Sequence, residues 1–176
     1  MAASRNQAPD RDRRALLRGR LRRTPLARPP WALEESRFAS ACTACNACVE
    51  ACPQRVLVAG EGGLPEFDPG RGECTFCGDC AEACPAPVFD LTQGAPWFQA
   101  ATIADTCFAR MGIVCQSCRD ACPTGAINFT IGWGGPSRPA VDRDACTGCG
   151  ACVSPCPAGA VTVVSAGNHK EARNVR

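Results

Sequence analysis

Apolar residues along this chain come in short runs that alternate with polar and glycine-rich segments. The runs lie at 56–58, 88–89, 126–129 and 161–164, and glycine-rich turns follow two of them, at 61–63 and 132–135. Short apolar segments on either side of a glycine turn predict β-hairpins. No stretch approaches the ~20 apolar residues of a membrane-spanning helix, so we expect a soluble protein.

Cysteine changes this picture most. The chain has 176 residues and 16 cysteines, in four blocks that each end in Cys-Pro and precede an apolar run. Block one is Cys42, Cys45, Cys48 and Cys52; block two is Cys74, Cys77, Cys80 and Cys84; block three is Cys107, Cys115, Cys118 and Cys122; block four is Cys146, Cys149, Cys152 and Cys156. Blocks one, two and four have the spacing Cys-x2-Cys-x2-Cys-x3-Cys-Pro, and block three has seven residues between its first two cysteines.

That spacing is the ligand pattern of bacterial [4Fe–4S] ferredoxins. Three closely spaced thiolates in an irregular loop suit three irons of one cube, and the small residues among them leave backbone N–H groups free to face sulfur. With no cysteine left over, the sequence predicts four [4Fe–4S] clusters held by all sixteen cysteines.

Two other uses of cysteine compete with this prediction. A disulfide-rich secreted scaffold would fit the composition, but no secretory signal with an apolar core is visible at the N-terminus. A zinc site usually needs paired Cys-x2-Cys motifs or histidines, whereas the chain has one histidine, His169, in a polar tail. Both alternatives fit the four repeated blocks less well than cubane clusters do.

The repeat predicts an α+β fold made of two tandem modules of the two-cluster bacterial ferredoxin type. We expect a basic arm and linker at 1–30, a first half at 31–95, a second half at 96–165 and a polar tail at 166–176. A short helix is expected between the third and fourth cysteines of a block. The core is too small to be stable through apolar burial alone, so a largely disordered cluster-free chain is expected.

In two-cluster ferredoxins the fourth cysteine of each block binds the other block's cluster. Sequential pairing of the blocks then predicts four ligand sets. These are Cys42, Cys45, Cys48 and Cys84; Cys74, Cys77, Cys80 and Cys52; Cys107, Cys115, Cys118 and Cys156; and Cys146, Cys149, Cys152 and Cys122. A nested pairing, of block one with four and two with three, is also compatible with the spacing.

Block three is irregular, since residues 108–114 separate Cys107 from Cys115. This insertion is expected either to reposition Cys107, to shield the cluster with Phe108, Met111 and Ile113, or to leave a labile site with three thiolates. Ligation by four cysteines is the favoured reading.

Charge is distributed unevenly. Residues 1–30 hold nine Arg and two Asp, a net charge of +7, and the rest of the chain has a net charge of −5. Four thiolates around an oxidised cluster contribute about −2, so four clusters would bring the formal charge of the whole chain from +2 to about −6. An acidic redox body would therefore carry a basic arm.

Three roles for the arm fit the sequence: a solvated tail, a docking element for a partner protein or membrane complex through Arg13, Arg14 and Arg18, or a nucleic-acid-binding segment. Docking is favoured, and no nucleic acid is expected, because the body is acidic. Arg13-Arg14 before Leu16-Leu17 is similar to a twin-arginine export signal, but charged residues follow where an apolar region should lie. We therefore expect a retained arm and a cytoplasmic protein.

No Ser/His/Asp set or phosphate-binding glycine loop indicates an enzyme. The Arg13-Arg14-Ala15-Leu16-Leu17 stretch, the linker Arg28-Pro29-Pro30-Trp31 and the long gap in block three resemble the NapF family over nearly the whole chain. NapF proteins are ferredoxin-type accessory proteins of the periplasmic nitrate reductase system.

This resemblance implies electron transfer or maturation, through iron–sulfur assembly, of a nitrate reductase catalytic subunit before export. The implied partners are the cytoplasmic precursor of that molybdenum-containing subunit and a membrane quinol-oxidising complex. The alternative is a soluble electron-relay subunit of another oxidoreductase complex.

Overall fold

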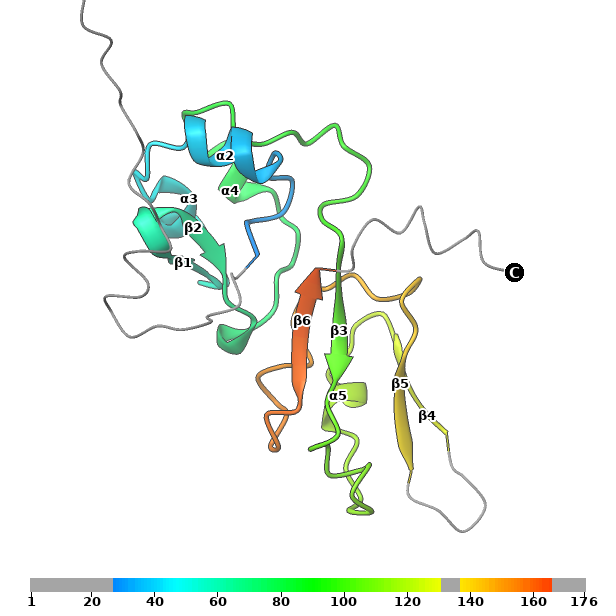
Figure 1. Ribbon diagram of the computed structural model, residues 1–176. Coiled ribbons are helices and arrows are strands. Elements are labelled where there is room, and N and C mark those ends of the chain that lie inside the picture. The colour runs from blue at the N-terminus through cyan, green and yellow to red at the C-terminus, as the bar shows by residue number, and fades with distance from the viewer. Residues whose placement is uncertain (1–26, 131–136, 166–176) are drawn as a thin grey trace, which may run out of the picture.

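Short helices, two-stranded sheets and connecting loops make up the protein. The computed structural model describes residues 27–130 and 137–165 (Figure 1). The helices are α2 (Glu35–Ala41), α3 (Ala47–Glu50), α4 (Asp79–Glu82) and α5 (Ser117–Asp120), with 3₁₀ turns at Glu61–Gly63 and Pro69–Arg71. The strands are β1 (Leu57–Ala59), β2 (Pro65–Phe67), β3 (Gln99–Ile103), β4 (Ile127–Thr130), β5 (Arg138–Val141) and β6 (Val161–Ser165).

The first half is built on the antiparallel β1–β2 hairpin, which the glycine turn at 61–63 predicted. Residues Leu57 and Phe67 are register partners in the hairpin and are buried together with Val56. Helix α2 packs on this half through Phe38, whose ring meets Phe89 edge-to-face with centroids 5.8 Å apart. The core is completed by two cysteines, Cys48 of α3 and Cys80 of α4.

The linker lies against the first half. Ala27 forms a β-bridge with Phe67, and Ala32 forms another with Phe89. Arg28 donates two hydrogen bonds of 2.7 Å to the carboxylate of Glu35, and its guanidinium lies 5.5 Å from the centre of the Phe38 ring. The described end of the expected arm therefore belongs to the packed structure.

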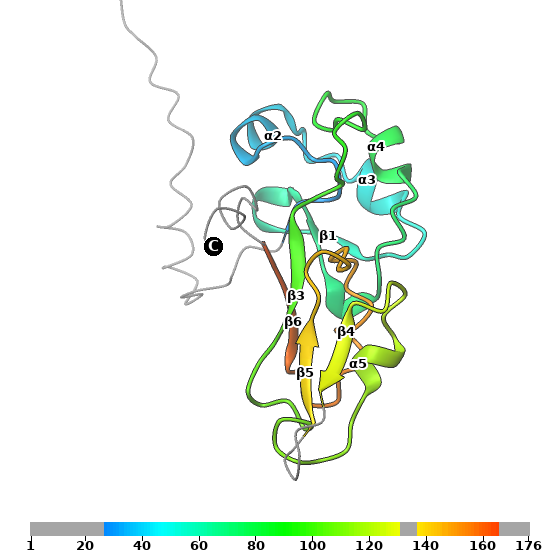
Figure 2. The same cartoon turned by 90° about the vertical axis from the view of Figure 1, so that its right-hand side faces the viewer.

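The second half contains two antiparallel sheets, β3–β6 and β4–β5. The β4–β5 pair is the second hairpin that the sequence predicted, and its turn lies outside the described residues. Ile127, Ala101 and Val161 from three of the strands form a buried cluster with Cys118 and Cys152. Figure 2 shows this half below the first, with the two sheets side by side.

The run Val88–Phe89, which has no glycine turn beside it, contributes only the bridge between Phe89 and Ala32, since Pro85 and Pro87 remove backbone donors next to it. One local expectation was wrong. The helix between the third and fourth cysteines forms in blocks one, two and three, but block four has turns at 151–155. Pro155 disfavours a helical conformation of the residue before it.

Candidate cluster-binding sites

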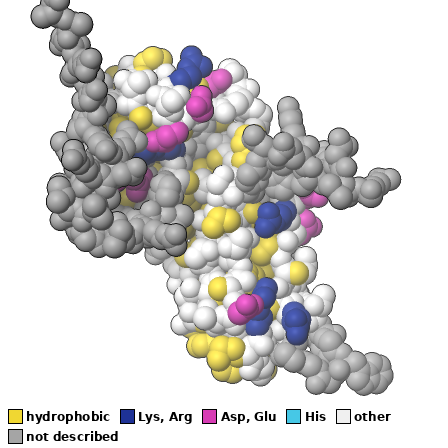
Figure 3. Space-filling view, viewed as in Figure 1, with side chains coloured by type: hydrophobic (Ala, Val, Ile, Leu, Met, Phe, Trp, Pro, Cys, Tyr) yellow, Lys and Arg dark blue, Asp and Glu magenta, His cyan; other side chains and the backbone are white. Residues whose placement is uncertain are grey.

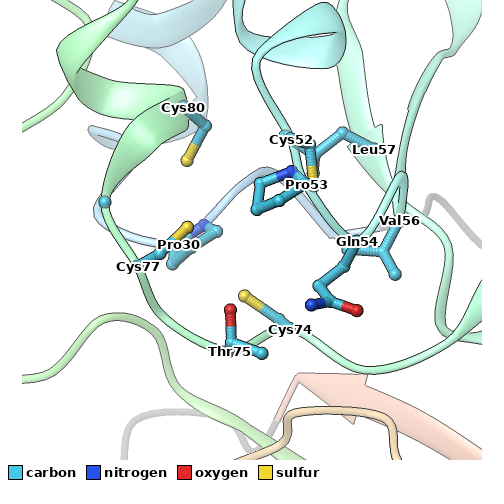
Figure 4. Close-up of a pocket in the computed structure, with 11 residues that line it drawn as sticks. Pro30, Cys52, Pro53, Gln54, Val56, Leu57, Cys74, Thr75, Cys77 and Cys80 are labelled. Carbon is cyan, nitrogen blue, oxygen red and sulfur yellow. The ribbon is translucent and has the colours of Figure 1, made fainter.

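Four cysteines surround one cavity in the first half. Cys74, Cys77 and Cys80 of block two line it together with Cys52 of block one, and its empty volume is about 340 Å³ with the mouth included. Figure 4 shows the four sulfur atoms facing a common space, with the rings of Pro30 and Pro53 beside it. The donors at this cavity are thiols in a largely apolar lining, which fits an iron–sulfur cluster.

Two further cavities have the same composition. One is lined by Cys42, Cys45, Cys48 and Cys84, and the other by Cys146, Cys149, Cys152 and Cys122. In all three cavities, the first three cysteines of one block meet the fourth cysteine of its neighbour. This grouping is the one that sequential pairing of the blocks predicts, and the nested pairing would require different neighbours.

The four remaining cysteines, those of the predicted block-three set, are brought together less closely. Cys107 is buried in one cluster with Ala109 and Ala160, against which Cys156 packs. Cys118 lies near enough to both cysteines that their charges contribute to the raised pKa of its thiol, after burial as the main cause. Cys115 is half-buried, with its Sγ 3.8 Å from the hydroxyl of Ser117. The structure thus brings Cys107, Cys118 and Cys156 together. Cys115, the remaining cysteine of this predicted set, stands three residues before Cys118 in the sequence.

The third cysteine of every block is buried, in contrast to the other three in most blocks. Burial raises the pKa of Cys80 and of Cys152 to about 12, and of Cys48 to about 11, with neighbouring thiolates adding to the effect. Burial likewise raises the pKa of Cys74 to about 11, with added influence from the charges of Cys52, Cys77 and Cys149. Without iron these thiols are protonated, so metal binding must displace their protons.

Backbone N–H groups face several of the sulfur atoms, and their donors lie outside the cysteine loops, whose small residues were expected to supply them. Ala126 donates to Sγ of Cys122 and Ala160 to Sγ of Cys156, both at 3.3 Å, and Ala101 donates to Sγ of Cys146 at 3.5 Å. Hydrogen bonds to ligand sulfur stabilise the thiolate and tune the reduction potential of a cluster.

The first two of these donors stand at a repeated position that the apolar runs indicated in part, since three of the four runs begin at it. The residue four positions after the last cysteine is fully buried in every block: Val56, Val88, Ala126 and Ala160. The signal was present, since an apolar residue stands at this position in all four blocks. It is valine in the first half and alanine in the second.

The second cysteine of each regular block lies between two residues with left-handed backbone. These pairs are Ala44 and Asn46 in block one, Phe76 and Gly78 in block two, and Gly148 and Gly150 in block four, all with φ between 54° and 91°. Left-handed residues in a loop turn successive N–H groups to one side and form concave anion sites. A non-glycine residue in this region costs roughly 1 kcal/mol, so the strain at Ala44, Asn46 and Phe76 marks the loops as specialised. In block three the equivalent residue, Gln116, has φ of −135°.

Asn46 stands out within the block-one cavity that it helps to line. Its Oδ1 is buried with no hydrogen-bond partner among the described residues. A buried amide oxygen without a partner costs about 1–3 kcal/mol. Because this oxygen is an acceptor, the sulfur atoms of a cluster, which are acceptors too, would not pair with it.

The block-three insertion forms a tight turn, in which Met111 N–H donates to the carbonyls of Cys107 and Phe108. Ala109 is buried, but Met111 and Ile113 are 63% and 51% exposed, so they do not form a buried shield. Figure 3 shows hydrophobic side chains gathered at the lower end of the molecule, over the loop that follows β3.

Several expectations fall outside the described residues. Arg13, Arg14, Arg18 and His169 all lie there. In the described part of the chain, no three His, Cys, Asp or Glu side chains are close enough to hold a single metal ion. The described helices are also all too short or too polar to cross a membrane.

Comparisons with known proteins agree with the cysteine geometry. The 4Fe-4S dicluster domain family matches the chain twice, at residues 41–88 and 112–160. The first match contains blocks one and two, and the second begins after Cys107. The ferredoxin-type protein NapF of Haemophilus influenzae is 46% identical over 136 residues, covering 77% of each chain.

The NapF protein of Escherichia coli K12 is 40% identical over 154 residues, covering 87% of this chain and 94% of the relative. A methylamine utilization ferredoxin-type protein, MauM of Methylorubrum extorquens, is 33% identical over 77% of this chain and 70% of its own length.

Proposed function

Because this chain belongs to the NapF family of ferredoxin-type proteins and contains two 4Fe-4S dicluster domains, we propose that it carries four [4Fe–4S] clusters and serves the periplasmic nitrate reductase system. It acts there in electron transfer, in maturation of the catalytic subunit before export, or in both. The single observation that carries the proposal is the meeting of three cysteines of one block with the last cysteine of its neighbour, seen at three cavities.

The proposed ligands are all sixteen cysteines, in the four sets of the sequential pairing. Block three supplies the least regular set, in which Cys115 joins Cys107, Cys118 and Cys156. A bound cluster would supply reversible one-electron chemistry. The chain contributes thiolate ligands, backbone N–H donors such as those of Ala126 and Ala160, and a buried position for the third cysteine of each block.

The chain acts as a carrier and not as an enzyme in this proposal. Its proposed partner is the cytoplasmic precursor of the molybdenum-containing catalytic subunit, and a membrane quinol-oxidising complex is the second. Support comes from the NapF relatives and from charge, because a basic N-terminal segment on an acidic cluster-bearing body is suited to docking. We place the protein in the cytoplasm, where reducing conditions favour such clusters.

Anaerobic purification with iron analysis tests the cofactor. We expect about sixteen iron atoms per chain, four for each cluster. A preparation with about eight iron atoms would contradict the four-cluster assignment while leaving a ferredoxin-type carrier.

A pull-down tests the partner. The full chain and a chain without residues 1–26 are compared for binding to the precursor of the catalytic subunit, since those residues hold most of the arginines of the arm. We expect the full chain to bind and the truncated chain to bind more weakly. If neither chain binds the precursor, the maturation role is wrong.

One relative supports the alternative role of an electron relay in another oxidoreductase complex, because MauM is named for methylamine utilization. Copurification of the loaded chain with a complex other than nitrate reductase would favour this role.

A further inference from the structure

We propose that the two halves are joined electronically at one place, the peptide contact between Cys74 and Cys149, and that Gly150 keeps this contact close. This inference rests on the proposed function, since it assumes that blocks two and four hold clusters. It also gives the order of the ligand loops in space: block one lies beside block two, block two beside block four, and block four beside block three.

The contact is a hydrogen bond between two proposed ligand residues. The N–H of Cys74 donates to the carbonyl oxygen of Cys149 at 2.8 Å. Cys74 lines the block-two cavity and Cys149 lines the block-four cavity. The two ligand loops therefore touch directly, with no other residue between their backbones.

Gly150 explains why the loops approach so closely. It has φ of +86°, and a Cβ placed on it would lie 2.7 Å from Cβ of Pro69, 3.0 Å from Cζ of Phe67 and 3.3 Å from the carbonyl oxygen of Gly72. All three neighbours belong to the first half. Even alanine at this position would have to push the block-four loop away from the first half.

Trp97 encloses the same junction. Its Nε1–H donates to the carbonyl oxygen of Thr147 at 2.7 Å. Its ring packs on Phe67 and Phe76, with centroid distances of 4.8 Å and 5.3 Å. Although it lies in the expected second half of the sequence, Trp97 packs against the core of the first half and holds block four beside it.

The step itself is a one-electron transfer. With clusters bound in the block-two and block-four cavities, an electron that crosses the junction would oxidise one of them by one electron and reduce the other by one electron, and no covalent bond would be made or broken. The peptide groups of Cys74 and Cys149 supply the short covalent and hydrogen-bonded connection between the two ligand shells.

Block two supplies a matched control for Gly150. Gly78 occupies the same position between the second and third cysteines and has φ of +91°, but a Cβ on it would meet no protein atom within 4 Å. Gly78→Ala and Gly150→Ala therefore place the same backbone strain beside a cluster, and only Gly150→Ala pushes the halves apart.

The experiment measures magnetic coupling between reduced clusters by EPR, in full-length protein reduced anaerobically with dithionite. Cys45→Ala and Cys115→Ala are introduced together as a background, because each removes a proposed ligand from one of the outer sites. Any splitting of the EPR signal that remains then reports magnetic coupling between the clusters of blocks two and four. We expect the background protein to show this splitting. Adding Gly78→Ala should leave the splitting in place, and adding Gly150→Ala should abolish it.

A second measurement does not depend on that background. Hydrogen exchange of the Cys74 amide in the otherwise unchanged, loaded chain should become about 3–10-fold faster with Gly150→Ala, the effect of one lost hydrogen bond, and stay unchanged with Gly78→Ala. If Gly150→Ala does not fold, Trp97→Phe replaces it, since it removes the bond to Thr147 and keeps an aromatic ring. Weaker splitting is then expected.

Two results would overturn the junction. One is splitting that persists in Gly150→Ala although exchange at Cys74 has increased; the other is an equal loss in Gly78→Ala. Iron analysis of the unchanged chain separates this failure from that of the proposed function. Full iron content with unaltered splitting rejects only the junction, whereas low iron content rejects the four-cluster assignment first.

Discussion

Cys52 faces Cys74 across a cavity whose other two cysteines, Cys77 and Cys80, also come from the block after its own. Cys84 takes the reciprocal position in the block-one cavity. The two cavities of the first half are therefore built from shared segments of chain, and neither block forms a site alone.

Exchange of the last cysteines can be tested by removing them one at a time. Cys52→Ala should weaken the block-two cluster, and Cys84→Ala should weaken the block-one cluster, because each removes one of four proposed ligands. Anaerobic alkylation with iodoacetamide followed by peptide mass spectrometry measures which thiols lose protection. We expect Cys74, Cys77 and Cys80 to react in Cys52→Ala while the cysteines of block one stay protected. Reaction of block one instead would mean that each block binds its own cluster.

Removal of iron should unfold most of the chain. Cys48, Cys80, Cys118 and Cys152 are themselves core residues, and isolated two-stranded sheets are only marginally stable in water. Since metal binding and folding are then coupled, we expect chelation of the iron under anaerobic conditions to abolish most of the far-UV circular dichroism of the folded protein. Reconstitution with iron and sulfide should restore the signal. A cooperative thermal transition in iron-free protein would contradict this prediction.

The buried residue four positions after the last cysteine should matter for stability. Val88 is fully buried and lines the block-one cavity together with Cys84, so Val88→Ala leaves a cavity beside this proposed ligand. We expect the temperature at which cluster absorbance disappears to fall by roughly 2–10 °C. Val164→Ala is the control, because Val164 is 37% exposed on β6, and its change should be about 2 °C or less. Equal effects of the two substitutions would remove any special role for this position.

The irregular block can be tested at Ala109, which packs with Cys107 and Ala160. A larger side chain cannot fit there without moving Cys107, so Ala109→Leu should reduce iron content by about four atoms per chain, one cluster. Met111→Leu, at an exposed position of the same turn, should leave iron content unchanged. If Ala109→Leu keeps its full iron content, Cys107 does not depend on this packing.

Sequence was most informative where the chemistry is local. Cysteine spacing predicted that the first three cysteines of a block lie together, while it left two pairings of the blocks open, and the glycines at 62–63 predicted the hairpin that follows block one. The missing helix of block four could also have been foreseen, since Pro155 stands one residue before Cys156. These features depend on backbone geometry over a few residues, which the residue types largely determine.

Contacts between the halves could not be predicted in the same way. Gly150 and Gly78 both stand directly after the second cysteine of a block, and nothing in the block pattern distinguishes one from the other. The difference appears only when Pro69 and Phe67 lie against one of them. Trp97 is similar, since its packing on the first half depends on the path of the connection between the halves and not on the repeat.

The crossed arrangement of the cysteines also has a consequence for biosynthesis. The block-one cavity lacks Cys84 until block two has left the ribosome, so no site of the first half is complete when its first three cysteines emerge. Each half must therefore be fully translated before its iron can be enclosed. Because the cavities of the first half take no cysteine from blocks three and four, that half can be completed while the second is still being made.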